Sequence, residues 1–328
     1  LLDRSRWQEA QTLWERCAEN LSLPTVWRNL ALIYYNKLHD APRARKAMQT
    51  AFAMDKTDAR VFFELDQLDK TTNAPYAERL ARMQENAALL PQRDDLYTEY
   101  ITLLNLDGQY QKAYDCIMEH TFHPWEGGEG KIPAQYRLAL IGLARAADDD
   151  TALALLQQAL TYPHNLGEGK LIGNLDNDLY EMIGELYAKR GDTARAEEAF
   201  RLAARGNFDL TGAIYYNDQP PQMMYYAAKA LAALGETDEA KKRFAAFIDY
   251  AEAHRDDVME IDYFAVSLPD FLIFEGDLNK NNRVHCCLME ALGALGLGDN
   301  ERARQAALRG LAENGCQSEL NRIVKGIL

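Results

Sequence analysis

The chain has 328 residues, of which 48% are hydrophobic and 26% are charged, so it can bury a large apolar core. Its formal net charge of −14 argues against nucleic acid as a partner, because binding to phosphate groups needs a basic face. No apolar run approaches the roughly 18 residues of a membrane helix, and no secretory signal opens the chain. We expect a cytoplasmic protein that binds neither nucleic acid nor membranes.

Apolar residues recur at helical spacing from the start of the chain. The chain opens at Leu1, without Met, inside a helical pattern, so we expect a fragment of a longer protein. The second helix of an incomplete pair is predicted by Trp7, Ala10, Trp14 and Cys17. The next pair is predicted by Trp27, Leu30, Ala31, Tyr34, Ala44, Met48 and Ala51.

A looser match covers 58–90, and regular helix pairs then follow to the end of the chain. They begin near Tyr97, Tyr136, Tyr180, Met224 and Cys287. The clearest pair carries Tyr180, Ile183, Gly184, Tyr187, Gly191, Asp192, Ala196, Phe200 and Ala203. Its order is large, large, small, large, a turn, then small, large, small. Small residues let two antiparallel helices approach closely, and large ones fill the space between them.

This order resembles the tetratricopeptide repeat, whose period is about 34 residues. The pattern predicts an all-α fold, a right-handed α-solenoid of seven to eight helix pairs. We divide the chain into repeats over 1–120, insert-bearing repeats over 121–283, and a final repeat with a C-terminal cap over 284–328, all in one solenoid.

Four long insertions separate the later pairs. The small residue that opens each second helix recurs at Ala113, Ala152, Ala196, Ala240 and Ala303, which gives separations of 39, 44, 44 and 63 residues. The excess over the repeat falls each time between the second helix of one pair and the first helix of the next. The predicted inserts cover about 121–133, 161–176, 206–220 and 254–283. The fourth is too apolar for a solvated loop, so we expect it to pack against the helices.

The first two inserts share the pattern P-x-x-x-G-E-G-K. It occurs at 124–131 and again at 163–170, 39 residues later. A core imposes no such repetition on a loop, so the pattern indicates a geometry or a ligand. We expect positive φ in at least two of Gly128, Gly130, Gly167 and Gly169. The pattern is not a Walker phosphate loop, which needs an earlier glycine and Ser or Thr after the lysine.

Three interpretations of this motif remain open: a staple between repeats, a ligand site and an accidental similarity. A staple would pair the charged residues with each other or with helix ends. A ligand site would gather them into a mixed-charge cluster beside aromatic rings, which suits hydroxyl-rich ligands or peptides. Its candidate residues are Trp125, Glu129, Lys131, His164, Glu168, Lys170, Tyr215 and Tyr216.

We predict no catalytic residue, no metal site and no cofactor. His123 and His164, with loop carboxylates, supply too few ligands with a consistent geometry for zinc. No serine stands in a G-x-S-x-G turn. The five cysteines have no regular spacing, which is typical of reduced, partly buried thiols.

Two segments resemble a particular family. They are Tyr162–Lys170, Y-P-H-N-L-G-E-G-K, and Asp262–Phe271, D-Y-F-A-V-S-L-P-D-F. They are similar to the YphG-like family of large bacterial proteins, in which a mutarotase-like β-sandwich domain of unknown function precedes tetratricopeptide repeats. The resemblance covers most of 90–312. It implies a bacterial parent protein connected with carbohydrate metabolism, and it implies no catalytic residue.

The sequence thus predicts a binding scaffold rather than an enzyme. Its inserts and concave face would hold the N-terminal domain of the same polypeptide, another protein or a carbohydrate-related ligand. The alternative is part of a carbohydrate-active enzyme whose active site a β-sandwich domain completes. A convergent carboxylate pair in a cleft would favour the enzyme, and a broad open groove would favour the scaffold.

Overall fold

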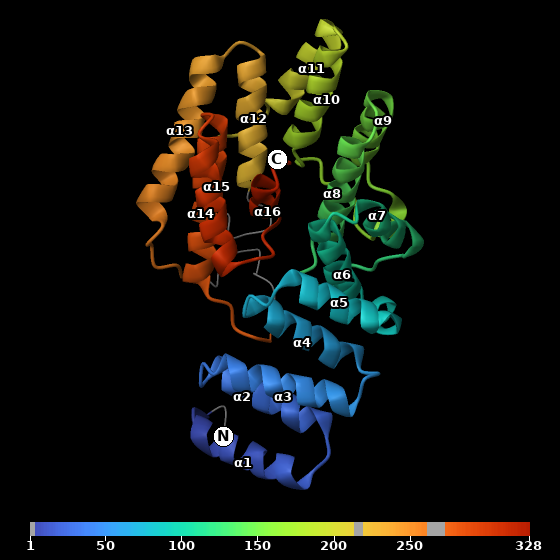
Figure 1. The fold of residues 1–328 in the computed structure, drawn as a ribbon, viewed down its shortest axis with the longest axis vertical. Coiled ribbons are helices and arrows are strands. Elements are labelled where there is room, and N and C mark those ends of the chain that lie inside the picture. Colours follow the sequence, from blue (N-terminus) through green and yellow to red (C-terminus); the bar gives the residue numbers. More distant parts are fainter. Residues whose placement is uncertain (1–3, 213–218, 261–272) are drawn as a thin grey trace. The chain divides into compact units, whose positions relative to one another are not determined.

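A computed structural model describes residues 4–212, 219–260 and 273–328, and in these ranges every regular element is a helix (Figure 1). The helices follow one another in pairs, so the predicted all-α fold of tetratricopeptide-like pairs is confirmed. The chain divides into an N-terminal unit, Leu1–Leu103 with Phe271–Asp277, and a C-terminal unit, Leu104–Asp270 with Leu278–Leu328. None of the described helices is long and apolar enough to cross a membrane.

The N-terminal unit contains the first helices of the chain. They are α1 (Trp7–Asn20), α2 (Pro24–Asn36), α3 (Ala41–Met54), α4 (Ala59–Thr71), α5 (Tyr76–Glu85) and the first part of α6 (Asp94–Asp107), with a 3₁₀ helix at Ala87–Gln92 between α5 and α6. The fully buried Ala31 and Ala44 belong to α2 and α3, where the pattern predicts small residues. The predicted pairing of these helices is therefore reproduced.

The segment 58–90 matches the repeat loosely because charges, and not only apolar packing, join α4 to α5. Arg79 and Asp66 are fully buried, and the Arg79 guanidinium donates to both Asp66 carboxylate oxygens over 3.0 and 2.6 Å. Arg79 also donates to Glu99 on α6 over 2.7 Å, and Lys70 donates to Glu99 over 2.9 Å. A buried carboxylate needs such partners to remain ionised.

The described end of the fourth insert packs against α2. Phe274 is fully buried and meets the Tyr35 ring edge-on, with centroids 5.5 Å apart. The Asn36 amide donates to the Ile273 carbonyl over 2.8 Å and accepts from the Glu275 backbone over 3.0 Å. The described residues 273–275 of this insert therefore pack against α2, as predicted for the insert. Residues 261–272 of the same insert lie outside the described residues.

The C-terminal unit contains the remaining helices. They are α7 (Tyr110–Glu119), α8 (Lys131–Ala146), α9 (Asp149–Ala159), α10 (Asn177–Lys189), α11 (Thr193–Ala203), α12 (Pro221–Ala233), α13 (Thr237–His254), α14 (Leu278–Gly296), α15 (Asn300–Glu313) and α16 (Ser318–Val324), and a 3₁₀ turn covers His164–Leu166. Long connections lead from α7 to α8, α9 to α10, α11 to α12 and α13 to α14. The four inserts therefore lie where the repeat spacing predicts them, but α8 begins at Lys131 and α14 at Leu278, inside the predicted first and fourth inserts.

Glycines let the paired helices of this unit approach. A Cβ atom at Gly184 on α10 would lie 2.6 Å from the Phe200 ring on α11. One at Gly296 on α14 would lie 2.2 Å from the Phe244 ring on α13. These distances are far shorter than any van der Waals contact. The order of small and large residues in the sequence therefore reflects the contacts between the helices.

We expect Glu99→Gln to lower stability at neutral pH but much less in acid. Burial raises the pKa of Glu99, but the charges of Lys70 and Arg79 outweigh it and hold this pKa at about 2, below the ordinary 4.5. A lowered pKa stabilises the fold above pH 4.5, and this contribution is lost as pH falls toward 2. Urea unfolding of both proteins at pH 7 and pH 3 measures it. An equal stability difference at both pH values would contradict the role of this carboxylate.

Candidate functional site

The first two inserts hold each other through backbone and side-chain hydrogen bonds. The Phe122 amide donates to the Asn165 carbonyl over 2.8 Å. The Asn165 side chain donates to the Ile117 and His120 carbonyls over 2.7 and 2.9 Å, and so satisfies the last turn of α7. Glu168 accepts from the Gly130 amide over 2.8 Å. The two motif loops lie side by side, as their equal position in consecutive pairs predicts.

The expectation of positive φ in at least two motif glycines is confirmed, but these two glycines occupy different positions of the motif. Gly130, the second glycine of the first copy, has φ 73°, and Gly167, the first glycine of the second copy, has φ 74°. Gly128 is needed for another reason, because a Cβ there would lie 2.2 Å from the Trp125 ring. A Cβ at Gly167 would lie 2.4 Å from the Phe122 carbonyl oxygen. The two copies share letters but not a backbone geometry.

Lys170 turns inward to a buried charge network. Its ammonium donates to the Leu160 carbonyl over 2.7 Å and to Asp176 over 2.5 Å. Arg137 on α8 pairs with Asp176 over 2.6 Å and also with Asp178. Burial lowers the pKa of Arg137, but the two carboxylates outweigh burial and raise it. Lys170 thus ties the second insert to the start of α10.

The other predicted site residues that the structure describes are exposed or half-buried. Glu129 and His164 are exposed, Trp125 is half-buried on its own loop, and Lys131 opens α8. Burial and the nearby Glu129 charge raise the pKa of Glu168, which the Gly130 amide opposes. Tyr215 and Tyr216 lie outside the described residues. Among the described residues, the geometry of Glu168 and Lys170 is that of a staple between repeats.

A groove that the sequence analysis did not identify lies on the C-terminal unit. It has a volume of about 260 Å³ and is lined by Glu181, Glu185, Phe200, Tyr225, Lys229, Ala232, Ala233, Phe244, Leu295 and Gly296. Its walls come from the first helices of three consecutive pairs, α10, α12 and α14, and from the two phenylalanines behind them. The groove is therefore apolar at its sides and charged along α10 and α12.

A buried carboxylate lies in this groove. The Lys229 ammonium lies 2.6 Å from Glu181 Oε1 and 3.2 Å from Glu185 Oε1. Glu181 is only 2% exposed, and its Oε2 has no hydrogen-bond partner among the described residues. Burial raises the pKa of Glu181 to about 7, the Glu185 charge adds to this effect, and Lys229 opposes it. This carboxylate retains an unused acceptor.

The repeat spacing contains a signal for this groove. Glu185 and Lys229 are 44 residues apart, which is also the separation of the repeat markers Ala196 and Ala240. The two charged residues therefore occupy equivalent positions on the first helices of neighbouring pairs. Opposite charges at equivalent positions of stacked helices predict an ion pair. Nothing in the sequence marks Glu181 as the buried member.

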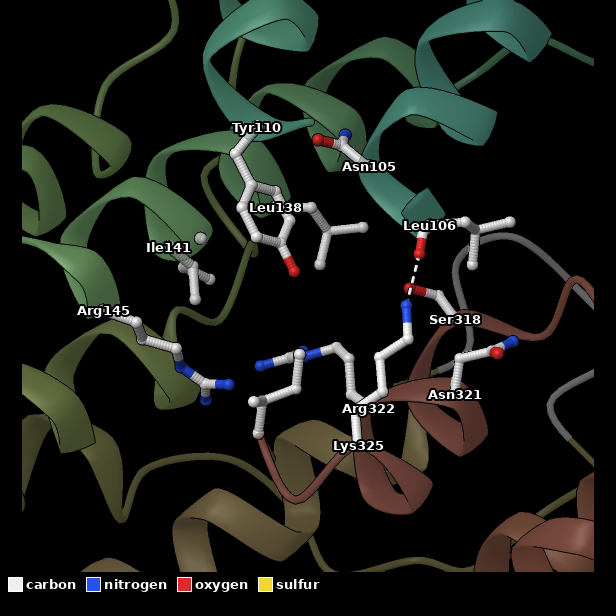
Figure 2. A pocket seen from close by; sticks show the side chains of 12 residues that line it. Asn105, Leu106, Tyr110, Leu138, Ile141, Arg145, Ser318, Asn321, Arg322 and Lys325 are labelled. Atoms are coloured by element: carbon white, nitrogen blue, oxygen red, sulfur yellow. Dashed lines mark hydrogen bonds between the residues drawn. The ribbon is translucent and has the colours of Figure 1, made fainter. Parts of the chain in front are cut away.

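The C-terminal helix α16 closes a second, narrower site. Residues of α16 and the following turn face the end of α6, α7 and α8 around a cavity of about 20 Å³, room for a single water molecule (Figure 2). The Lys325 ammonium donates to the Leu106 carbonyl over 2.6 Å. Arg145 of α8 and Arg322 of α16 point toward one another, and burial, with the nearby Arg322 charge, lowers the pKa of Arg145. The chain's own helix thus occupies this side of the unit.

The chain matches no known family model. It is similar to a chain of the Naa15/Naa10 complex bound to HypK-THB, with 12% identity over 100% of this chain and 60% of that one, at a TM-score of 0.43. It is also similar to the C-terminal part of a TPR repeat-containing protein from Cytophaga hutchinsonii, with 13% identity over 100% and 97% of the two chains, at a TM-score of 0.25. The P58(IPK) TPR domain matches at 13% identity over 87% and 94%, with a TM-score of 0.28.

These likenesses are distant, and the chain spans only 60% of the length of the first. The assignment of a tetratricopeptide-like fold therefore rests on the chain's own helix pairs and on the close contacts between small and large residues within them.

We expect Gly167→Ala to destabilise the protein by roughly 1 kcal/mol or more, because alanine disfavours positive φ and its Cβ would clash with the Phe122 carbonyl. Gly169→Ala is the matched control, since its φ is ordinary and no atom lies within 4 Å of a Cβ there. Thermal unfolding of both variants measures the difference. Equal losses would show that the loop does not depend on this backbone geometry.

We expect Lys170→Ala to cost about 1–3 kcal/mol, because it removes a charged donor from the half-buried Leu160 carbonyl and Asp176. Lys189→Ala is the control, since its ion pair with Asp149 is exposed and such pairs contribute less than about 1 kcal/mol. Chemical unfolding measures both values. A stable Lys170→Ala protein would remove the support for a staple.

Proposed function

We propose that the chain is a binding scaffold that holds a segment of a partner polypeptide in the groove between α10, α12 and α14. The observation that carries this proposal is the open groove of about 260 Å³ across three consecutive first helices. Apolar walls supply burial, and the few polar groups between them supply orientation, which is the usual composition of a recognition site.

The placement of α16 supports a polypeptide as the ligand. Leu320 is fully buried and packs where Gly310 of α15 has no side chain, and Lys325 binds a helix carbonyl of α6. The C-terminal unit therefore already accepts one short helix, which packs against α15 and α14. A segment of another protein, or of the N-terminal domain of the same polypeptide, would use the part that α16 leaves open.

The two motif loops have a structural role in this proposal, because the hydrogen bonds between them join neighbouring pairs. A second proposal concerns the other candidate residues of these inserts: Trp125, Glu129, Lys131 and His164, with Tyr215 and Tyr216, would contact a carbohydrate-related ligand. An aromatic face beside mixed charges suits a neutral, hydroxyl-rich ligand. The resemblance to bacterial proteins of carbohydrate metabolism motivates this ligand class.

The enzyme alternative draws on the two carboxylates in the groove. Glu181 and Glu185 both lie within 3.2 Å of the Lys229 ammonium, and the pKa of Glu181 is about 7. A general acid needs a carboxyl group that is free to transfer its proton to a substrate. Lys229 holds both carboxylates, so the arrangement favours recognition over proton transfer.

The experiment is selection of random twelve-residue peptides displayed on phage against the full chain. We expect selected peptides to lose at least tenfold in affinity for Ala233→Trp, which fills the groove from an exposed position of α12. Ala146→Trp, an exposed substitution at the end of α8 away from the groove, should leave affinity unchanged. Titration calorimetry measures both.

Two results would contradict the proposal. One is a failure to select any peptide, and the other is selected peptides that bind both tryptophan variants equally well. A sugar that binds the chain and is lost in Trp125→Ala, but not in Ala233→Trp, would instead support the carbohydrate proposal at the motif loops.

A further inference from the structure

We propose that the groove between α10, α12 and α14 is a receptor for a basic side chain, and that the buried carboxylate of Glu181 binds the lysine or arginine of the partner segment. This inference rests on the proposed function and names the chemistry of the partner. The structure contributes three observations: an unused acceptor, an uncompensated charge and apolar residues that line the groove beside them.

The unused acceptor is Glu181 Oε2. Its partner oxygen, Oε1, accepts from Lys229 over 2.6 Å, but Oε2 is buried and has no hydrogen-bond partner among the described residues. A buried acceptor without a partner costs free energy, because it has lost its hydrogen bond to water. When Glu181 is ionised, a donor that arrives with a ligand recovers this free energy.

The uncompensated charge follows from the groups that face this carboxylate. Glu181 and Glu185 come from α10, and Lys229 and Tyr225 come from α12. From α14 the groove receives only Leu295 and Gly296, which carry no charge. Two carboxylates therefore share one ammonium when both are ionised. One additional cation would make the site neutral, whereas an anion would meet repulsion.

The apolar lining of the groove suits a long side chain with a terminal charge. Phe200, Phe244 and Leu295 provide apolar walls, against which the methylene groups of lysine or arginine can lie. The Tyr225 ring also lines the groove, on the same helix as Lys229. Aromatic rings stabilise cations over their faces. A short or acidic side chain would use neither the walls nor the rings.

The site also has a built-in dependence on pH. With a pKa of about 7, the Glu181 carboxyl is protonated below neutrality and ionised above it. Tyr225, whose pKa burial raises to about 12, stays neutral over this range, and Lys229, whose pKa is raised by its two carboxylate partners, stays charged. A cationic ligand should therefore bind more tightly as the pH rises from 5.5 to 8.

The test uses the full chain and pools of random nonapeptides in which the central residue is fixed as Lys, Arg, norleucine or Glu. We expect the Lys and Arg pools to bind at least tenfold more tightly than the norleucine pool at pH 8, and the Glu pool to bind most weakly. The advantage of the Lys pool over norleucine should shrink severalfold at pH 5.5. Fluorescence anisotropy with labelled pools measures each value.

Two variants identify the groups. Glu185→Gln changes an exposed carboxylate of the groove and should lower the preference for Lys without lowering the melting temperature. Glu197→Gln, on the exposed face of α11 where Glu197 pairs with Arg201, is its control and should change nothing. Glu181→Gln should abolish the dependence on pH between 5.5 and 8, provided that its melting curve shows a folded protein.

The outcomes separate this inference from the proposed function. If the norleucine and Lys pools bind equally and both are lost in Ala233→Trp, the groove binds peptides but the basic specificity is wrong. A preference for Lys that survives Glu185→Gln and does not change with pH would also overturn it. If no pool binds, the proposed function itself fails.

Discussion

The close approach of two helices, a glycine on one against an aromatic ring on the other, is the contact on which the C-terminal unit depends. Gly184 faces Phe200, Gly296 faces Phe244, and a Cβ at Gly142 of α8 would lie 2.3 Å from the Tyr110 ring of α7. Each contact removes a side chain from one helix so that a ring can fill the space. A β-carbon there would require the ring or the helices to shift.

This packing constrains the two helices of a pair and the short turn between them. It does not constrain the length of the connection from one pair to the next. The first two inserts use that freedom to bind each other: Asn165 satisfies the end of α7, and Glu168 satisfies the start of α8. Lys170 then fixes the second insert to α10. The result is a rim of hydrogen bonds between consecutive pairs, and the groove formed by α10, α12 and α14 lies in the same unit.

Much of this arrangement follows from the sequence, since periodic small and large residues report contacts that recur in each pair. The helix pairs, the positions of the inserts and the contact between the two motif loops were all predictable in this way. The motif glycines were not, because Gly130 and Gly167 adopt positive φ at different positions of one letter pattern. A pattern of letters does not specify which residue of a turn takes the unusual conformation.

Contacts between distant segments could not be predicted from the sequence, for a different reason. Phe274 packs beside Tyr35, and Lys325 binds the Leu106 carbonyl, with over 200 residues between the partners of each contact. Neither contact repeats, so no period reveals it. The groove is an intermediate case. The equal spacing of Glu185 and Lys229 could have indicated it, but its lining combines residues from three helix pairs.

The central claim is that the groove between α10, α12 and α14 binds a segment of a partner polypeptide. A crystal structure of the chain with a selected lysine-containing peptide tests it most directly. The account predicts peptide density across α10, α12 and α14, with the lysine ammonium within hydrogen-bond distance of Glu181 Oε2 and the motif loops unchanged. Peptide density against Trp125 and Glu129, with an empty groove, would contradict it.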